Sequence, residues 1–331
     1  MKILVIRFSS IGDIVLTTPV LRCIKQQVQD AELHFLTKKQ FTPLISFNPF
    51  VDKIKTLDTS WDLMIHELMV EKYDYIIDLH HNLRTLRIKK ALKGIPNFSF
   101  NKLNIPKWLY TFLKINKLPK IHIVDRYIAV AKPLGVKNDL KGLDFFINDK
   151  ELIKDKDIPA SHAYGFIGIV IGAALNTKKL PVEKIRQLCN SIQYPIMLMG
   201  GKEDKENGDI IAMGDDIKIY NSCGKFSLNE SAQLVKKAKL IITHDTGLMH
   251  IAAALNKPII SIWGNTTPLF GMNPYYKESS QAASIIFEIE LCCRPCSKIG
   301  YAKCPKGHFK CMQNQPINLI AETAIKMLSK V

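Results

Sequence analysis

The chain alternates short runs of β-branched and other apolar residues with longer stretches in which apolar residues recur at helical spacing. This alternation is typical of βαβ units on parallel sheets. It predicts two successive series of strands. Their ranges are Lys2–Phe8, Glu32–Thr37, Lys53–Leu57 and Tyr75–Leu79, then Gly165–Ile171, Pro195–Met199, Ile217–Tyr220, Leu240–Thr243, Pro258–Trp263 and Ser284–Phe287. Two such series predict an α/β protein with two Rossmann-like domains.

A polar stretch separates the two series. Within Asn148–His162 the residues Lys, Asp and Glu dominate, and Pro159 interrupts any regular period. We therefore expect residues 1–155 to form the first domain and residues 156–331 the second. The last segment, Pro316–Val331, carries apolar residues at helical spacing and predicts a terminal helix.

The overall composition is that of a globular protein. A length of 331 residues fits two domains of about 150 residues each. With 47% hydrophobic and 23% charged residues, disordered, collagenous and coiled-coil chains are excluded. No apolar run reaches the roughly 18 residues that a membrane-spanning helix needs. Arg7 and Asp13 interrupt the apolar start, which is unlike a signal peptide, so we expect a cytoplasmic protein.

The formal net charge of +16 indicates an anionic partner. Between residues 84 and 120 there are ten basic residues, interleaved with aromatic ones, and no acidic residue. We expect this segment to contact an anionic acceptor or a membrane surface, although a solvated face is the alternative. Nucleic acid is disfavoured as the partner because the sequence contains no recognised RNA-binding or DNA-binding module. The residues expected to make the contact are Arg84, Arg87, Lys107, Lys114 and Lys117.

The first candidate site follows the first predicted strand, at Ser9–Asp13. The carboxyl ends of parallel strands form the crevice in which doubly wound sheets bind ligands. Gly12 permits close approach of the backbone, and the N–H groups of the helix that follows attract anions. Asp13 has two interpretations, as a functional carboxylate or as a helix N-cap.

A second candidate site follows Leu240–Thr243. Asp245, Thr246 and Gly247 stand at the start of a helix whose N-terminus can hold a diphosphate. His250 lies within the first two turns of that helix, where it either faces the crevice or packs in the core. The absence of G-x-G-x-x-G and of G-x-x-x-x-G-K-[ST] argues against a dehydrogenase and against a P-loop nucleotidase.

Two further turns in the second half have the same character. Gly200 and Gly201 follow a predicted strand, where a backbone turns tightly or approaches a ligand. Thr177 and Lys178 follow another, and a lysine in such a turn either pairs with a phosphate or is solvated. Together, these turns predict a nucleotide held by loops.

The run from Ile6 to Pro19 (IRFSSIGDIVLTTP), taken with Asp245 to Ala254 (DTGLMHIAAA), closely resembles the ADP-heptose:lipopolysaccharide heptosyltransferases of glycosyltransferase family nine. The likeness extends over nearly the whole chain. It implies a GT-B fold with two facing Rossmann-like domains, the acceptor bound by the first and the nucleotide-sugar donor by the second. It also implies a C-terminal helix that packs back on the first domain.

The resemblance assigns roles to individual residues. Asp13 would be the catalytic base, and Lys178 would contact the donor diphosphate. The donor site would be lined by Asp245, Thr246, Gly247 and His250. At Leu180 the chain departs from the tryptophan that many relatives carry in a Lys-Arg-Trp-Pro run.

The resemblance thus implies an inverting, metal-independent transferase that moves heptose from ADP-heptose to the inner core of lipopolysaccharide, at the cytosolic face of the inner membrane. The alternative is a transferase of the same fold that uses another nucleotide-sugar or a non-lipopolysaccharide glycan.

Five of the eight cysteines cluster near the C-terminus. No cofactor is required for the expected chemistry, but these spacings could hold a structural zinc ion. The alternative is a reduced, packed loop, because disulfides are unlikely in the cytoplasm. The expected zinc ligands are Cys292, Cys296, Cys304 and Cys311.

Overall fold

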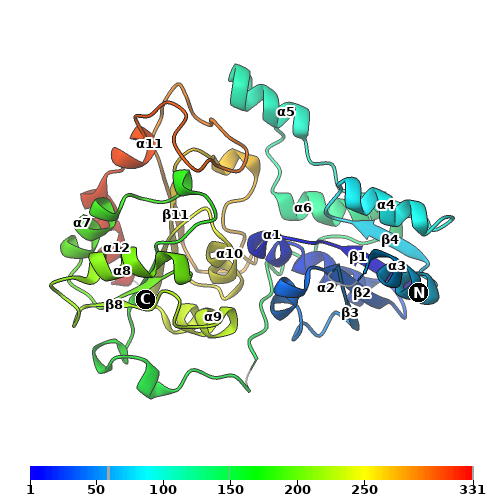
Figure 1. Cartoon of the computed structure of the whole chain (residues 1–331), viewed down its shortest axis with the longest axis horizontal. Helices are drawn as coiled ribbons and strands as arrows, with labels where there is room; N and C mark the ends of the chain where they lie inside the picture. Colours follow the sequence, from blue (N-terminus) through cyan, green and yellow to red (C-terminus); the bar gives the residue numbers. More distant parts are fainter. Residues whose placement is uncertain (58–59, 149, 330–331) are drawn as a thin grey trace. The chain divides into compact units, whose positions relative to one another are not determined.

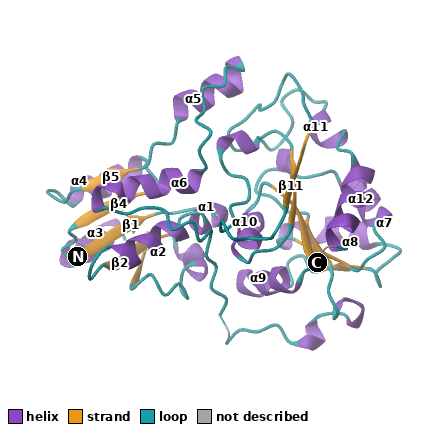
Figure 2. Cartoon of the chain, turned by 180° about the vertical axis from the view of Figure 1, so that it is seen from behind, coloured by secondary structure: helices purple, strands orange, loops and turns teal. Residues whose placement is uncertain are grey.

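A computed structural model describes residues 1–57, 60–148 and 150–329. The chain forms two compact units, each with its own sheet; their strands are drawn in orange in Figure 2. The first unit comprises residues 1–103, 121–146 and 277–279, and the second comprises residues 104–120, 147–276 and 280–331.

The first unit contains a parallel sheet with strand order β3-β2-β1-β4-β5. Its strands are β1 (Lys2–Ile6), β2 (Glu32–Thr37), β3 (Lys53–Thr56), β4 (Tyr75–Asp78) and β5 (Asn97–Ser99). Its helices are α1 (Ile11–Val15), α2 (Thr18–Gln27), α3 (Trp61–Val70), α4 (Leu83–Ala91) and α6 (Ile123–Ile128), with 3₁₀ helices at Lys39–Leu44 and Ala129–Leu134. Figure 1 shows these elements mainly in blue to cyan.

The second unit contains a parallel sheet with strand order β11-β10-β9-β6-β7-β8. Its strands are β6 (Ile167–Val170), β7 (Ile196–Met199), β8 (Ile219–Asn221), β9 (Leu240–His244), β10 (Ile259–Trp263) and β11 (Ser284–Glu288). Its α-helices are α5 (Asn104–Trp108), α7 (Val182–Ser191), α8 (Lys205–Ala212), α9 (Leu228–Lys237), α10 (Gly247–Ala254), α11 (Lys310–Gln313) and α12 (Ile317–Leu328). A π-helical turn follows α5 at Leu109–Leu113, and 3₁₀ helices lie at Asp155–Asp157, Ala160–His162, Asn176–Lys178, Lys202–Asp204 and Pro268–Phe270.

Both sheets have the doubly wound order that the alternating sequence pattern predicts, and every predicted strand is confirmed to within a few residues. The strand β5 was not predicted. It has only three residues, and Phe98 stands between two exposed neighbours, so it lacks the apolar run of the other strands.

The polypeptide leaves the first unit at Phe146, before the predicted boundary between residues 155 and 156. Residues beyond that point pack on α9. The backbone N–H of Asn148 donates to Asn229 Oδ1 at 2.9 Å, and that of Ile153 donates to Gln233 Oε1 at 2.9 Å.

The terminal helix α12 is confirmed, although residues 330 and 331 of its predicted range lie outside the described residues. The expectation that it packs back on the first domain is wrong. Ile320 and Ala324 are fully buried in the core of the second unit, beside Leu188 of α7. The helix packs there because its apolar face matches that of α7, which is equally amphipathic.

Candidate functional site

Each sheet has one position at which the strand order reverses, between β1 and β4 in the first unit and between β6 and β9 in the second. In doubly wound sheets the loops that leave the carboxyl ends of such strands bind ligands. Asp13 follows β1, Lys178 follows β6, and Asp245 follows β9. The catalytic residue and the main donor residues expected from the sequence therefore stand at these two switch points.

Asp13 lies in the first turn of α1 and is held by two neighbours. Its Oδ1 atom lies 2.7 Å from an Arg7 guanidinium nitrogen. Its Oδ2 atom accepts hydrogen bonds from the Ser10 hydroxyl at 2.8 Å and the Ser10 backbone N–H at 3.1 Å. Burial alone would raise the pKa of Asp13, but Arg7 and these hydrogen bonds outweigh it and hold the pKa below its ordinary value. Ser10, not Asp13, is thus the N-cap residue of α1; Asp13 is the third helical residue of its capping box and an ionised carboxylate.

Arg7 is a residue that the sequence analysis did not select. Only 9% of its side chain is exposed. Its guanidinium donates to the carbonyl oxygens of Ser9 and Leu79 and to the hydroxyl of Tyr127, at 2.6–2.9 Å. These contacts fix the orientation of the guanidinium so that it faces Asp13. The only sequence signal for this arrangement is a basic residue inside an apolar strand.

His80 follows β4 on the other side of the same switch point. Burial, with Arg7 and Lys102 nearby, lowers the pKa of His80 to about 4, so the imidazole is neutral at physiological pH. Its ring packs at 4.8 Å from that of Phe8. The first site therefore combines an ionised carboxylate with a neutral histidine.

In the second unit, Lys178 and Asp245 form an ion pair. The Lys178 ammonium lies 2.6 Å from Asp245 Oδ2 and 3.3 Å from the Asp245 carbonyl oxygen. Both side chains are mostly buried, with 16% and 12% exposed. Asp245 Oδ2 also accepts a hydrogen bond from the Thr266 hydroxyl at 3.1 Å. The structure thus joins three loops at this point, those after β6, β9 and β10.

Helix α10 begins beside this pair. Thr246 is its N-cap residue and accepts from the Met249 N–H at 3.4 Å, and Gly247 is its first residue. Such an N-terminus carries partial positive charge and attracts anions. His250 is 2% exposed, which agrees with the packing interpretation of this histidine.

The two glycines after β7 have a structural role. A Cβ atom on Gly200 would lie 2.9 Å from the Asp204 side chain, and the Gly201 N–H donates to Asp204 Oδ2 at 3.0 Å. Asp204 is buried and pairs with Lys179 at 2.7 Å. The glycines let the backbone wrap this carboxylate, and their expected contact with the donor stays a prediction.

The hydroxyl of Thr177 already makes hydrogen bonds within the protein. Its Oγ1 atom donates to the Tyr301 carbonyl at 3.0 Å and accepts from the Tyr301 N–H at 2.8 Å. The residue is 2% exposed. This contact with the C-terminal loop is not revealed by any local sequence signal, and the expected contact of Thr177 with the donor stays a prediction.

Two buried residues near this site, His244 and Asn265, were not selected from the sequence. The Leu180 N–H donates to His244 Nε2 at 3.0 Å, and burial with Lys179 nearby lowers the pKa of His244 to about 4. Asn265 is 1% exposed, and its side-chain amide has no hydrogen-bond partner among the residues that the structure describes.

The basic segment 84–120 does not form one surface within one unit. Arg84 and Arg87 lie on α4 of the first unit, where the Arg87 guanidinium stacks 4.4 Å from the Trp61 ring centroid. Lys107, Lys114 and Lys117 lie in residues 104–120, which belong to the second unit. The expected single patch is therefore divided between the two units.

Lys114 also differs from the expectation of a surface contact. Its ammonium donates to the carbonyl oxygens of Thr111, Cys293 and Pro295, at 2.8, 3.0 and 2.8 Å. These bonds use its three protons. Lys114 thus anchors the C-terminal loop rather than offering its charge to a ligand.

The expected zinc site in the cysteine-rich segment stays a prediction. All eight cysteines are free thiols, and Cys311 is buried in the core of the second unit. Tetrahedral zinc at about 2.3 Å from each sulfur needs thiols less than about 4 Å apart. Among the described residues, no three side chains of this segment bring ligand atoms within 4.8 Å of one another. Cys293 Sγ lies 3.8 Å from His308 Nε2, and Cys292 is exposed, so the segment is not packed throughout.

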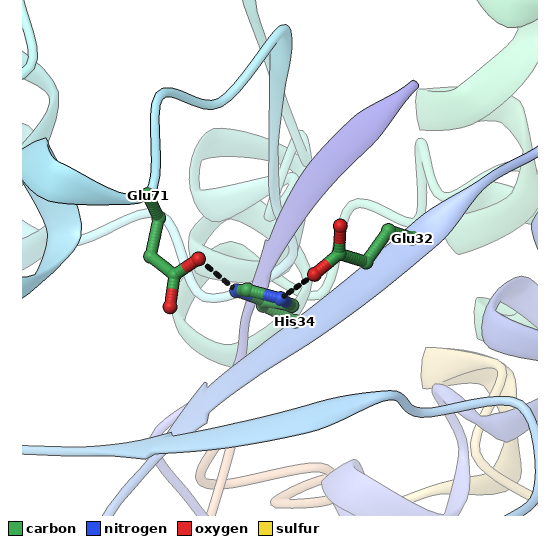
Figure 3. Close-up of side chains that lie close together, drawn as sticks. All are labelled: Glu32, His34 and Glu71. Atoms are coloured by element: carbon green, nitrogen blue, oxygen red, sulfur yellow. Dashed lines mark hydrogen bonds and ion pairs between the residues drawn. The ribbon is translucent and has the colours of Figure 1, made fainter.

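One group elsewhere does bring three potential metal ligands together, namely Glu32, His34 and Glu71 (Figure 3). Both ring nitrogens of His34 have partners, Glu32 at 2.8 Å and the Tyr73 hydroxyl at 2.9 Å. Glu71 faces the ammonium groups of Lys2, Lys53 and Lys55. Hydrogen bonds from Lys55 and Lys2 lower the pKa of Glu71 to about 2. Lysines thus already neutralise this carboxylate. The group lies where strands begin, away from the switch point, and we interpret it as an ion-pair network.

Comparison with solved structures identifies the fold class. The chain aligns over its whole length with a family 9 glycosyltransferase of Veillonella parvula at a TM-score of 0.77 and 22% identity, covering 98% of that chain. It aligns equally with the ADP-heptose heptosyltransferase II of E. coli at a TM-score of 0.74 and 20% identity, covering 99% of that chain. The fold is that of the GT-B glycosyltransferases.

The sequence also identifies the family. The family described as glycosyltransferase family 9 (heptosyltransferase) matches residues 62–301. The chain belongs to this family and is a glycosyltransferase. It is 28% identical to lipopolysaccharide heptosyltransferase 1 of Campylobacter coli, over 80% of this chain and 84% of that protein. It is 25% identical to lipooligosaccharide heptosyltransferase 2 of Campylobacter jejuni, over 99% of this chain and 98% of that protein.

Proposed function

We propose that the protein is an inverting heptosyltransferase that transfers heptose from ADP-heptose to the inner core of lipopolysaccharide. The observation that carries this proposal is the chemistry at the two switch points. An ionised carboxylate, Asp13, stands at the first, and an ammonium group, Lys178, stands beside a helix N-terminus at the second. The first suits an acceptor hydroxyl and the second suits a diphosphate.

The proposed reaction is a single displacement. Asp13 accepts the proton of the acceptor hydroxyl while that oxygen forms a bond to the anomeric carbon of the donor sugar. The bond between the anomeric carbon and the diphosphate oxygen breaks, and its electron pair leaves with ADP. Lys178 and the N–H groups of Thr246 and Gly247 stabilise the charge that develops on the diphosphate. Because these groups supply positive charge, the proposed mechanism is independent of metal.

The identity of the donor rests on relatives. One solved structure with this fold is described as an E. coli heptosyltransferase with ADP, and another as that enzyme with ADP-2-deoxy-2-fluoro heptose. We expect ADP to bind this protein at least about tenfold more tightly than UDP or GDP, a difference of about 1.4 kcal/mol. Isothermal titration calorimetry with the three nucleotides tests this. Tighter binding of UDP or GDP would instead favour a transferase of the same fold with another nucleotide-sugar.

We also propose that the enzyme associates peripherally with the cytosolic face of the inner membrane, where its acceptor would lie. In the described residues, no helix has the length and apolar character to cross a bilayer. The segment 104–117 instead exposes apolar side chains beside lysines. Ile105 is 73% exposed and Phe112 is 64% exposed, and Trp108 stacks on Phe112. Aromatic and basic residues together suit an anionic interface.

Charge reversal in this segment is expected to weaken membrane binding. The double variant Lys107→Glu with Lys117→Glu should partition into anionic phosphatidylglycerol vesicles at least about tenfold less than the wild type, because each basic residue contributes about 1 kcal/mol. Vesicle sedimentation measures this. The variant Lys205→Glu with Lys236→Glu makes the same charge change on α8 and α9, and should partition like the wild type. Equal partitioning of both variants would contradict the proposed surface.

A further inference from the structure

The C-terminal loop is tied to the loop after β6 through Thr177. The Thr177 hydroxyl and backbone N–H exchange three hydrogen bonds with the backbone of Tyr301, at 2.8–3.1 Å. The approach is close because residue 300 is a glycine. A Cβ atom on Gly300 would lie 3.0 Å from the Leu175 side chain, and its φ of +118° favours glycine. This contact fixes the residue that precedes Lys178.

The same loop is tied to the segment after β10 through Arg294. Its guanidinium donates to the carbonyl oxygens of Gly264 and Thr266, the latter at 2.9 Å. It donates further to the carbonyl oxygen of Ile289 at 2.6 Å and to the Glu288 carboxylate at 2.9 Å. Only 7% of the Arg294 side chain is exposed.

A third contact, between backbone groups, joins the C-terminal loop to the segment after β10. The Cys296 N–H donates to the Asn265 carbonyl oxygen at 3.1 Å. Between Cys296 and Tyr301 the loop is ordered by Ser297, whose hydroxyl accepts from the N–H groups of Ile299 and Gly300 at 3.1 and 2.8 Å. The loop is therefore a shaped connection rather than an irregular tail.

The two ends of this connection meet at the Lys178–Asp245 pair. Arg294 binds the Thr266 carbonyl, and the Thr266 hydroxyl donates to Asp245 Oδ2, which pairs with Lys178 at 2.6 Å. Thr177, bound to Tyr301, is the covalent neighbour of Lys178. The contacts therefore form a continuous series that starts at Arg294, passes through the Lys178–Asp245 pair and returns to the same loop at Tyr301.

We propose that residues 294–301 are the positioning element of the donor site, in which Arg294 and Thr177 hold Asp245 and Lys178 in place for a diphosphate. The inference rests on the proposed function for the identity of the ligand. Neither Arg294 nor Thr177 touches the ligand in this proposal.

The physical reason lies in the nature of lysine. Its ammonium stands on a flexible four-carbon stem and loses rotamer entropy when it is fixed. A site that fixes the ammonium before the ligand arrives avoids that cost at binding, as does any preorganised site. Loss of either tie should therefore weaken binding of a diphosphate ligand and spare functions that do not use Lys178.

The first test uses ADP as the probe and calorimetry as the measurement. Thr177→Val keeps the shape of the side chain and removes the two hydrogen bonds of its hydroxyl, and we expect ADP to bind about tenfold more weakly. Thr177→Ser keeps the hydroxyl and should bind ADP within about twofold of the wild type. Arg294→Lys keeps the charge but not the fork of donors, and should also lose about tenfold.

The second test separates positioning from general destabilisation. In the background Lys178→Met, the added changes Thr177→Val or Arg294→Lys should have no further effect on ADP affinity, because their route to the ligand is already removed. Additive losses in the double variants would overturn the proposal. So would full ADP affinity in both single variants.

Hydrogen exchange provides a readout that needs no ligand. In Thr177→Val the backbone amides at positions 177 and 178 should exchange about tenfold faster than in the wild type, with those of α9 unchanged. Unchanged exchange at these two amides would refute the positioning role. If the wild type binds no ADP, the proposed donor is wrong, and the exchange measurement still decides the inference.

Discussion

Replacing Asp13 by Asn is expected to lower kcat by about 100- to 10,000-fold, the range that a general base contributes. Asn has nearly the same shape and can still accept a hydrogen bond from Ser10, but it cannot accept the proton of the acceptor hydroxyl. The measurement is release of ADP from ADP-heptose with a panel of truncated lipopolysaccharide acceptors. ADP affinity should be unchanged, since the proposed donor site lies in the second unit, and it serves as the control for folding.

Two outcomes would contradict this assignment. If the Asn variant retained wild-type turnover, the role of Asp13 would be limited to the capping box of α1 and its ion pair with Arg7. If the Asn variant lost both turnover and ADP binding, the cause would be misfolding around the buried Arg7, which would have lost its ion-pair partner. A second variant, Asp13→Glu, would then be needed because it keeps a carboxylate for Arg7.

The dependence on pH follows from the same residue. Arg7 and the hydrogen bonds from Ser10 hold the pKa of Asp13 below its ordinary value, so the carboxylate stays ionised at neutral and mildly acidic pH. A base is active when deprotonated, so kcat/KM should be constant from about pH 8 to about pH 5 and fall only below that range. An acid limb near pH 6.5 would instead indicate a histidine as the base.

Replacing Lys178 by Met is expected to lower kcat/KM for the donor by about 100- to 1,000-fold, the effect of removing one donor to a developing oxyanion. Met keeps the apolar stem, and Asp245 keeps its hydrogen bond from Thr266. Turnover against donor concentration gives the value. Lys205→Met, at an exposed position on α8, is the matched control and should be unaffected. Unchanged kinetics for Lys178→Met would remove the proposed leaving-group contact.

The two sheets could be predicted because buried parallel strands read as continuous apolar runs, such as Ile167–Val170 and Ile259–Trp263. The same pattern placed Asp13, Lys178 and Asp245 just after predicted strands, whereas the order of the strands, and with it the two switch points, came from the structure. Local pattern determines these features, so one sequence was sufficient.

The ties that shape the donor site could not be predicted in the same way. Thr177 binds Tyr301 across 124 positions of sequence, and Lys114 binds the Cys293 carbonyl across 179. Most of these bonds use backbone groups, which every residue carries, so residue identity gives no signal. For Lys114, a run of basic residues indicated a surface role, whereas the structure shows three carbonyl acceptors.

The path of the chain has a consequence for its synthesis. Residues 104–120 leave the first unit and join the second before the chain returns to the first at residue 121. Lys114 leaves the ribosome long before the loop around Cys293 is synthesised. Its hydrogen bonds to that loop can therefore form only when nearly the whole polypeptide has been made. A protein fragment that ends at residue 155 would contain residues 104–120 without the rest of the second unit. A fragment that begins there would lack Lys114, which anchors the C-terminal loop.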